Sequence, residues 1–273
     1  MPRTAVLALV SAFAVGCLPG VLVGPGAAPA QTGATAALPL RPGTDPTGRP
    51  AARTVRPLAT NPAARRGAAT PAAHPVAQEP IKAFPARGRT ITLTFDDGPD
   101  PRWTPTVLDL LRRYHAHAIF CMVGLHVAAH PDLVRRVVRE GHQLCDHTWS
   151  HDEHLRHRAP AVIEDEIGRT ATLLTRTAGV VPRYYRAPAG NWGANVIAVA
   201  RAHGLAPLGW AVDPGDWARP GTETIVERVL SGAAPGAVVL MHDGYGDRIQ
   251  SVAALRVILE RLAARGYRFT VPP

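Results

Sequence analysis

Cysteine and aromatic residues are scarce in this chain of 273 residues, which has three Cys and five each of Phe, Trp and Tyr. The scarcity is greatest in residues 31–85, where 14 Ala and 10 Pro accompany a single aromatic residue, Phe84. Such a segment cannot bury enough apolar surface to offset the entropy lost on ordering. We therefore expect residues 31–85 to be a disordered or partly extended linker without a core.

Acidic residues are also rare in this linker, which has two Asp and Glu against seven Lys and Arg. The linker contributes five of the chain's nine net positive charges and Arg3 contributes one more, so residues 86–273 carry only +3. A basic tail without interleaved aromatic residues is poorly suited to nucleic acid, and we expect no nucleic-acid partner. The tail fits adhesion to an anionic cell wall, although a solvated linker would have the same composition.

Residues 1–30 have the layout of a secretory signal peptide, with a basic start at Arg3, an apolar run over 5–23 and a small-x-small cleavage site at 28–30. The alternative is a membrane anchor, but the run is short, is broken by a Pro-Gly pair and lacks a basic flank. Cys17 weakly resembles a lipoprotein acceptor site, although the apolar stretch continues past it. We expect a secreted or cell-wall-associated protein with no stable membrane insertion after cleavage.

An exported protein meets oxidising conditions, and this gives the two remaining cysteines, Cys121 and Cys145, two interpretations. Each lies in or at the end of a predicted strand, and the two strands are consecutive in the sequence. The cysteines form either a disulfide or a pair of buried thiols that pack as small apolar groups.

From residue 89 onward, short apolar runs alternate with longer amphipathic ones. Strands are predicted over 90–95, 118–123, 143–145, 184–186, 205–210, 237–241 and 268–271. Helices are predicted over 104–114, 131–140, 160–178, 194–203, 222–231 and 249–265. This repeated order predicts one α/β domain, residues 86–273, with a parallel sheet that is open or closed into a barrel. In such folds functional sites gather at the carboxyl ends of the strands.

Two polar motifs follow predicted strands. Asp96 and Asp97 come at the end of the first strand, before a Gly-Pro turn, and His147 and His151 follow the third. One carboxylate and two imidazoles form a three-ligand set for a divalent metal, with a position left for water. The second carboxylate is then free to act as a base on that water. If residues 147–151 enter a helix, their i, i+4 spacing puts both imidazoles on one face.

Each motif also has a structural interpretation. An Asp-Asp-Gly-Pro sequence can be a turn with a capping acid, and the histidines, with His154 and His157 nearby, can form an exposed loop. His154 and His157 come after the motif, and we leave them out of the site.

Three further groups follow strands, namely Arg186-Ala187-Pro188-Ala189-Gly190, Asp213-Pro214-Gly215-Asp216-Trp217 and Leu240-Met241-His242-Asp243-Gly244. With the first two motifs, and in this order, they closely resemble the polysaccharide deacetylase family, carbohydrate esterase family 4. The resemblance covers about residues 88–270. It implies a distorted (β/α) barrel with parallel strands and a metal-dependent hydrolase that removes acetyl groups from polysaccharides.

The resemblance also implies a role for each motif residue. Asp97, His147 and His151 hold the metal, and Asp96 is the base that takes a proton from the water. His242 is the general acid that protonates the departing amine, which is otherwise a very poor leaving group.

Arg186 and Asp216 resemble the family's supporting residues. Arg186 would hold Asp96 and keep it ionised, while Asp216 would fix His242 and raise its pKa. Asp213 is an alternative to Asp216 in that role. The alternative is that this arginine and aspartate form an ion pair at the surface without a role in the site.

The substrate contacts implied by the resemblance are fewer. A backbone N–H in the loop after Pro188, together with the metal, would hold the oxyanion. The family commonly has tyrosine after this proline and the chain has Ala189, which keeps the backbone donor but lacks a side-chain wall. Among the tryptophans near motif loops, we expect Trp217 to contact a sugar and Trp210 to pack in the core.

We expect a secreted, metal-dependent deacetylase acting on N-acetyl groups of N-acetylglucosamine-containing glycans, either peptidoglycan or chitin oligomers. The alternatives are an esterase that acts on O-acetylated xylan with the same site, a non-catalytic carbohydrate-binding wall protein and a metal-dependent phosphodiesterase. Two histidines and one aspartate suit zinc, and cobalt or nickel would also fit. We expect the protein to be a monomer.

Overall fold

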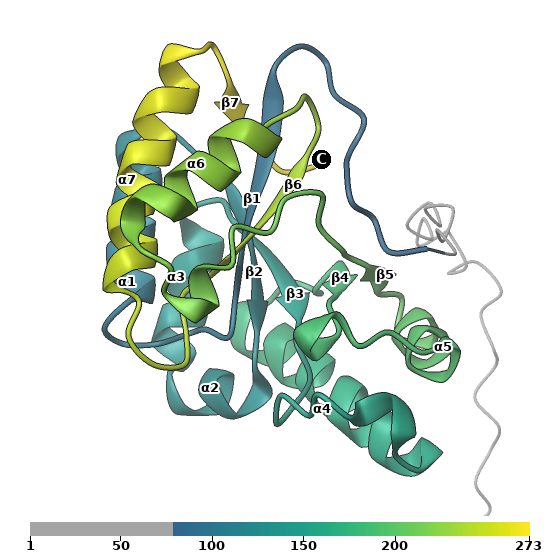
Figure 1. The fold of residues 1–273 in the computed structure, drawn as a ribbon. Coiled ribbons are helices and arrows are strands. Elements are labelled where there is room, and N and C mark those ends of the chain that lie inside the picture. Colours follow the sequence, from purple (N-terminus) through teal and green to yellow (C-terminus); the bar gives the residue numbers. More distant parts are fainter. Residues whose placement is uncertain (1–78) are drawn as a thin grey trace, which may run out of the picture. The chain divides into compact units, whose positions relative to one another are not determined.

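The computed structural model describes residues 79–273, so the predicted signal peptide and most of the predicted linker lie outside the described residues. Strands and helices alternate along the described chain (Figure 1). The strands are β1 (Thr90–Asp96), β2 (Ala118–Met122), β3 (Gln143–Asp146), β4 (Tyr184–Tyr185), β5 (Ala206–Pro207), β6 (Val238–His242) and β7 (Arg268–Phe269).

The α-helices are α1 (Thr104–Arg113), α2 (Gly124–Ala129), α3 (Pro131–Arg139), α4 (Pro160–Ala178), α5 (Ala194–Ala202), α6 (Thr222–Gly232) and α7 (Ile249–Ala264). Three short 3-10 helices are η1 (Leu155–His157), η2 (Pro188–Gly190) and η3 (Asp216–Ala218). The six predicted helices are confirmed, with ends that differ by no more than one residue. Their starts and stops have local causes, such as a proline in the first turn of α1 and Gly179 in the left-handed conformation (φ 72°) after α4.

The structure differs from the predicted elements mainly where strands or helices are short. The strands predicted over 184–186 and 205–210 pair over only two residues each, as β4 and β5. Helix α2 was not predicted, because it has only six residues and follows β2 with a single residue between them. A segment this short has too few turns for a helical period to show in the sequence.

All strand pairs are parallel, in the order β5-β4-β3-β2-β1-β6, with β7 paired to the start of β1. The two edges of this curved sheet are joined by single-residue bridges. Val212, beyond β5, pairs with Val239 of β6, and the segment before β1 reaches both edges through Ile81 with Leu208 and Ala83 with Ala237. The predicted distorted barrel is confirmed as a parallel half-barrel with helices around its outside (Figure 1).

Residues 80–85 fill the seam of this barrel. The backbone N–H of Ile81 donates to the carbonyl of Pro207, and that of Phe84 donates to the carbonyl of Gly236, both at 2.8 Å. Ile81 and Phe84 are also partly buried against the interior cluster. The folded domain therefore begins several residues before its predicted start, because this segment has the Pro- and Ala-rich composition of the linker but finds partners on both sheet edges.

Alternation along the strands sorts side chains between two environments. From β1, Ile91, Leu93 and Phe95 join the large apolar cluster between the sheet and the helices, while Thr94 and Asp96 lie on the other face. The interior holds a smaller cluster, consisting of Ile119, Cys121, Cys145, Tyr184, Leu208 and Val238. The barrel interior is thus mixed in polarity, and its polar side chains lie toward the carboxyl ends of the strands.

Cys121 and Cys145 are direct register partners in β2 and β3 and form a disulfide inside the barrel. Their Cα atoms are 4.1 Å apart, and both residues are fully buried. The disulfide interpretation is therefore confirmed, and the bond joins the strand that leads to His147 to its neighbour.

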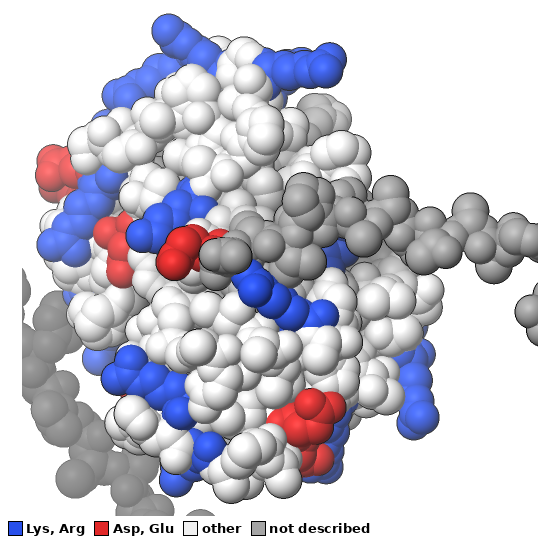
Figure 2. Space-filling view, turned by 90° about the vertical axis from the view of Figure 1, so that its right-hand side faces the viewer, with Lys and Arg blue, Asp and Glu red and all other residues white. Residues whose placement is uncertain are grey.

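Within residues 79–273, none of the helices has the length and apolar character needed to cross a membrane. On the face of these residues seen in Figure 2, Lys and Arg side chains are scattered among acidic and uncharged ones.

Removing the seam segment should destabilise the domain. We predict that a chain of residues 86–273 has a free energy of unfolding about 2 to 4 kcal/mol lower than one of residues 79–273, because it loses four backbone hydrogen bonds and partly buried apolar surface. Urea denaturation followed by tryptophan fluorescence measures the difference. Phe84→Ala in the longer chain should show part of the loss, and equal midpoints for both chains would contradict the seam's role.

Candidate active site

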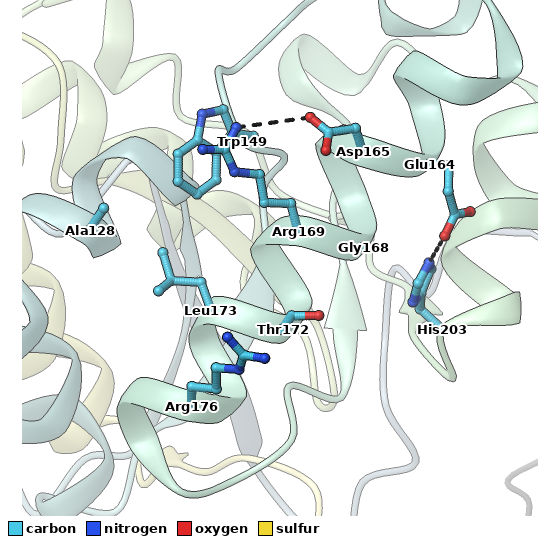
Figure 3. A pocket seen from close by; sticks show the side chains of 10 residues that line it. All are labelled: Ala128, Trp149, Glu164, Asp165, Gly168, Arg169, Thr172, Leu173, Arg176 and His203. Atoms are coloured by element: carbon cyan, nitrogen blue, oxygen red, sulfur yellow. Dashed lines mark hydrogen bonds and ion pairs between the residues drawn. The ribbon is translucent and has the colours of Figure 1, made fainter. Parts of the chain in front are cut away.

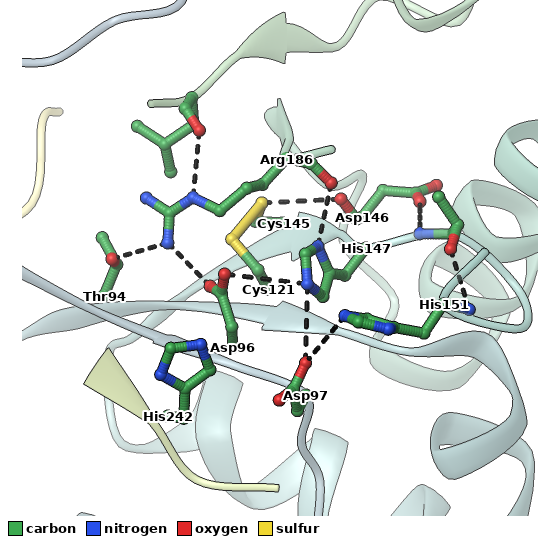
Figure 4. A network of polar contacts seen from close by, with 12 residues as sticks. Thr94, Asp96, Asp97, Cys121, Cys145, Asp146, His147, His151, Arg186 and His242 are labelled. Carbon is green, nitrogen blue, oxygen red and sulfur yellow. Dashed lines mark hydrogen bonds and ion pairs between the residues drawn. A yellow bond between two sulfur atoms is a disulfide. The ribbon is translucent and has the colours of Figure 1, made fainter. Parts of the chain in front are cut away.

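The three predicted metal ligands converge at the carboxyl ends of β1 and β3. Asp97 follows β1 and His147 follows β3, so parallel pairing through β2 brings both to the same end of the barrel. The Oδ1 atom of Asp97 lies 3.6 Å from Nε2 of His147 and 3.3 Å from Nε2 of His151 (Figure 4). The predicted triad is thus assembled in space.

The backbone that brings the two histidines together is a turn and not a helix. Thr148 and His151 both have left-handed backbones, with φ of 68° and 60°. The turn is held by the N–H of Thr148, which donates to Oδ1 of Asp146 at 2.8 Å, and by the N–H of His151, which donates to Oγ1 of Thr148 at 3.0 Å. The two imidazole centroids are 5.0 Å apart.

The donor set fits a divalent cation. One ligand atom from each of Asp97, His147 and His151 lies within 4.8 Å of the others. Oδ1 of Asp97 is buried and has no hydrogen-bond partner among the described residues. Burial raises the pKa of Asp97, but its contacts with His147 and His151 outweigh this and hold the pKa well below the usual range, so the carboxylate is ionised.

His147 is oriented for ligation by its other ring nitrogen. Nδ1 lies 2.8 Å from the carbonyl oxygen of Arg186, which can only accept, so Nδ1 carries the proton. Nε2 is left with its lone pair toward Asp97. A backbone partner on one imidazole nitrogen is the usual way to fix a metal-binding tautomer.

The candidate base, Asp96, is held by a fully buried arginine. Nη1 of Arg186 donates to Oδ1 of Asp96 at 2.6 Å and to Oγ1 of Thr94 at 2.7 Å (Figure 4). Its Nε and Nη2 donate to the carbonyls of Leu208 and Gly209. The other carboxylate oxygen of Asp96, Oδ2, faces the triad, 3.7 Å from Nε2 of His147.

The candidate acid, His242, ends β6 beside β1 and is paired with Asp216. Nδ1 of His242 lies 2.7 Å from Oδ1 of Asp216, whose Oδ2 accepts the N–H of His242 at 3.0 Å and the hydroxyl of Ser251 at 2.7 Å. Burial lowers the pKa of His242, but Asp216 outweighs it and raises the pKa to about 9. The imidazole is therefore protonated at neutral pH.

Asp216, rather than Asp213, supports the imidazole. Asp213 is exposed, and its Oδ1 accepts the backbone N–H of Gly215 at 2.8 Å. The short helix η3 turns Asp216 inward, where it is fully buried. The motif alone could not tell which of the two carboxylates pairs with His242, because only the local turn determines which one points inward.

The predicted substrate contacts lie on exposed loops at the same end of the barrel. Trp217 follows Asp216 and is 59% exposed. Ala189 is exposed and has a left-handed backbone (φ 50°) within η2, directly after buried Pro188. Trp210 is partly buried against the interior cluster, as expected of a core residue.

Trp149 lies between the two predicted metal ligands His147 and His151 in sequence, but its ring packs against α4 and the start of α2. It lines a groove of about 530 Å³ along α4, and the guanidinium of Arg169 stacks over its ring at 3.5 Å (Figure 3). A Cβ on Gly124 would collide with this ring, so Trp149 also packs against the start of α2. Its ring connects the metal-binding loop to the helices.

Several site residues were missed by the sequence analysis. Nδ1 of His126 donates to the carbonyl oxygen of Asp97 at 2.7 Å, and Nη2 of Arg248 lies 3.8 Å from Oδ2 of Asp97. Asp243 is fully buried and accepts the hydroxyl of Thr104 at 2.6 Å, and burial raises its pKa to about 7. The sequence signal for Asp243 was its position beside His242, whereas nothing local marked His126 or Arg248.

Comparison with known proteins agrees with this geometry. The sequence profile for polysaccharide deacetylase matches residues 84–208. A chitooligosaccharide deacetylase from Bradyrhizobium sp. (strain ANU 289) is 43% identical over 192 residues, covering 66% of this chain and 87% of that protein. This chain belongs to the polysaccharide deacetylase family. The identity is spread over most of the relative's length, as expected of a shared domain.

Two further matches support the family assignment. A peptidoglycan-N-acetylglucosamine deacetylase from Bacillus cereus is 41% identical over 187 residues, covering 68% of this chain and 87% of that protein. The crystal structure of the Bc1960 peptidoglycan N-acetylglucosamine deacetylase matches with a TM-score of 0.66 at 33% identity, covering 69% of this chain and 88% of that chain. Polysaccharide deacetylases are hydrolases, and the chain is an enzyme of this class.

The pairing of His242 with Asp216 can be tested in the metal-free deacetylase. In Asp216→Asn, His242 loses a hydrogen-bonded negative charge, so its pKa should fall from about 9 toward the ordinary 6.5. Titration of the imidazole by NMR measures this value. Asp213→Asn is the matched control and should leave the pKa unchanged; a shift of equal size in the control would reject the assignment.

Proposed function

We propose that this deacetylase is a secreted, zinc-dependent enzyme that hydrolyses N-acetyl groups of N-acetylglucosamine-containing glycans, either chitin oligomers or peptidoglycan. One observation carries the proposal: the Asp97, His147 and His151 triad lies beside a held carboxylate, Asp96, whose register partner on β6 is a protonated imidazole, His242. An amide needs both groups, because water must lose a proton as it attacks and the amine must gain one as it leaves. The names of the two curated relatives point to the same substrates.

Asp97, His147 and His151 would hold the metal. Two imidazoles and one carboxylate form a donor set found in catalytic zinc sites, and cobalt or nickel would suit it as well. When bound, such a cation polarises the acetyl carbonyl and lowers the pKa of water to about 7.

Asp96 acts as the general base through Oδ2. Arg186 occupies Oδ1 and fixes the carboxylate, so Oδ2 is the oxygen that faces the triad. A carboxylate fixed by an arginine can receive the proton of an attacking water without first reorienting.

His242 acts as the general acid. Asp216 occupies Nδ1, so Nε2 is the nitrogen that can deliver a proton to the amine. An imidazolium with a pKa of about 9 is fully protonated at neutral pH. The developing oxyanion would accept a hydrogen bond from the backbone N–H of Ala189, which lies in the exposed turn η2.

The N-terminal region supports the proposed location. Its signal-like residues 1–30 would direct export, and the basic residues of the linker would favour an anionic cell wall. The enzyme would act there on its polysaccharide as a monomer.

Acetate release from purified protein tests this function. We expect release from chitin oligomers or peptidoglycan that a chelator abolishes and one equivalent of zinc restores. Acetylated xylan is assayed in parallel, and release from xylan alone would replace the proposal by an O-acetyl esterase. Failure to release acetate from all three polymers, with one zinc bound, would instead favour a carbohydrate-binding protein.

The separate roles of the two aspartates give a sharper prediction. Asp97→Ala should lose zinc and turnover together, because it removes a ligand. Asp96→Asn should keep zinc but lower kcat about 10²- to 10⁴-fold, because the amide cannot accept the proton. Zinc content by atomic absorption and kcat from acetate release are measured on both variants. Near-normal kcat in Asp96→Asn would refute the base assignment, and Asp213→Asn is the matched control.

A further inference from the structure

Tyr245 lies in a strained loop beside the metal-binding triad and has no part in the proposed reaction. The loop follows β6, and Tyr245 adopts a left-handed backbone with φ of 47°. A bulky residue in this region costs free energy, and such positions persist only where the surroundings enforce them.

The loop is held from both sides. The indole N–H of Trp103 donates to the carbonyl of Gly246 at 2.8 Å, and Nε of Arg248 donates to the carbonyl of Gly244 at 2.6 Å. Gly244 packs directly on the backbone of Asp97, where a Cβ would collide with the Asp97 carbonyl. The position of Tyr245 is therefore fixed relative to a metal ligand.

The tyrosine ring borders the site. Its centroid lies 4.7 Å from that of His126 and 5.4 Å from that of His151, and both rings are inclined to it. Tyr245 nevertheless remains 42% exposed. One part of the side chain contacts the metal-binding wall while the rest is open to solvent.

A second exposed aromatic residue lies on the acid side of the site. Trp217 is 59% exposed and directly follows Asp216, which holds His242. The site thus has a partly exposed ring at His151, Tyr245, and a second exposed aromatic residue, Trp217, next in sequence to the acid's partner Asp216. Sugar rings have apolar faces that pack on aromatic rings, and a tyrosine adds a polar group at its edge.

We propose that Tyr245 is a substrate-binding residue that packs against a second N-acetylhexosamine unit, a neighbour of the unit that loses its acetyl group. This inference rests on the proposed function, which supplies the polymer. It predicts that the enzyme binds oligomers better than single sugars, and that part of this preference comes from Tyr245.

The test uses three variants on the full chain. Tyr245→Gly removes the ring and also relieves the backbone strain, so the variant should fold. Tyr245→Phe keeps the ring, and Val181→Ala changes an exposed apolar side chain elsewhere as the matched control. We measure KM and kcat for chitin oligomers of two to six units, KM and kcat for a small activated acetyl ester, and zinc affinity.

We expect Tyr245→Gly to raise KM for the longer oligomers about three- to tenfold, with little change in kcat, ester KM or zinc affinity. Val181→Ala should behave as the unsubstituted enzyme, and Tyr245→Phe, which keeps the ring, should raise KM less than Tyr245→Gly does. An unchanged KM at every chain length would overturn the proposal. A parallel loss of zinc affinity and of ester turnover would also overturn it, because the ring would then serve only to support His151.

Binding of chitin oligomers to the zinc-loaded Asp96→Asn variant, with and without Tyr245→Gly, separates this proposal from the proposed function. A ring-dependent affinity supports the role of Tyr245 even if the unsubstituted enzyme releases no acetate from these oligomers. Equal affinity with and without the ring rejects that role, even if the deacetylase activity is confirmed.

Discussion

The buried ion pair between Arg186 and Asp96 is the interaction on which the interior of this barrel depends. Arg186 is fully buried, and its guanidinium ties β4 to β1 and to the backbone beyond β5. Two charges in such an environment carry a desolvation cost that only close pairing and full hydrogen bonding offset. The same contacts fix one oxygen of Asp96 and leave the other toward the triad, so an element of the fold also sets the direction in which the free carboxylate oxygen points.

The short helix α2 supports both loops that carry the predicted metal ligands. The start of α2 meets both of them, because the N–H groups of Val123 and Gly124 donate to the carbonyls of Gly98 and Thr148, while the ring of His126 reaches the carbonyl of Asp97. These loops have left-handed residues and no regular structure of their own. Their geometry therefore depends on a neighbouring short helix that contributes no ligand.

Sequence reasoning reached the element order, the parallel sheet and the triad, because long amphipathic helices and polar residues after apolar runs are strong local signals. It did not reach contacts that only folding brings together. The i, i+4 spacing of His147 and His151 would suit a helix, but a turn held by Asp146 and Thr148 aligns the imidazoles instead. Which of Asp213 and Asp216 supports His242 is decided by the short helix η3, which the sequence did not predict. Pairing of residues 80–85 requires two sheet edges that are far apart in the chain, so no local pattern marks it.

The disulfide has a chemical consequence for the metal site. Cys145 is two residues before His147, and the bonded sulfurs lie in the interior beside Arg186 and Asp96 (Figure 4). As free thiolates, two cysteines are among the strongest zinc ligands in proteins and would compete with an Asp-His-His set for a soft metal. Oxidation removes them as ligands. The disulfide therefore leaves nitrogen and oxygen atoms as the donors available to a metal ion at this end of the interior.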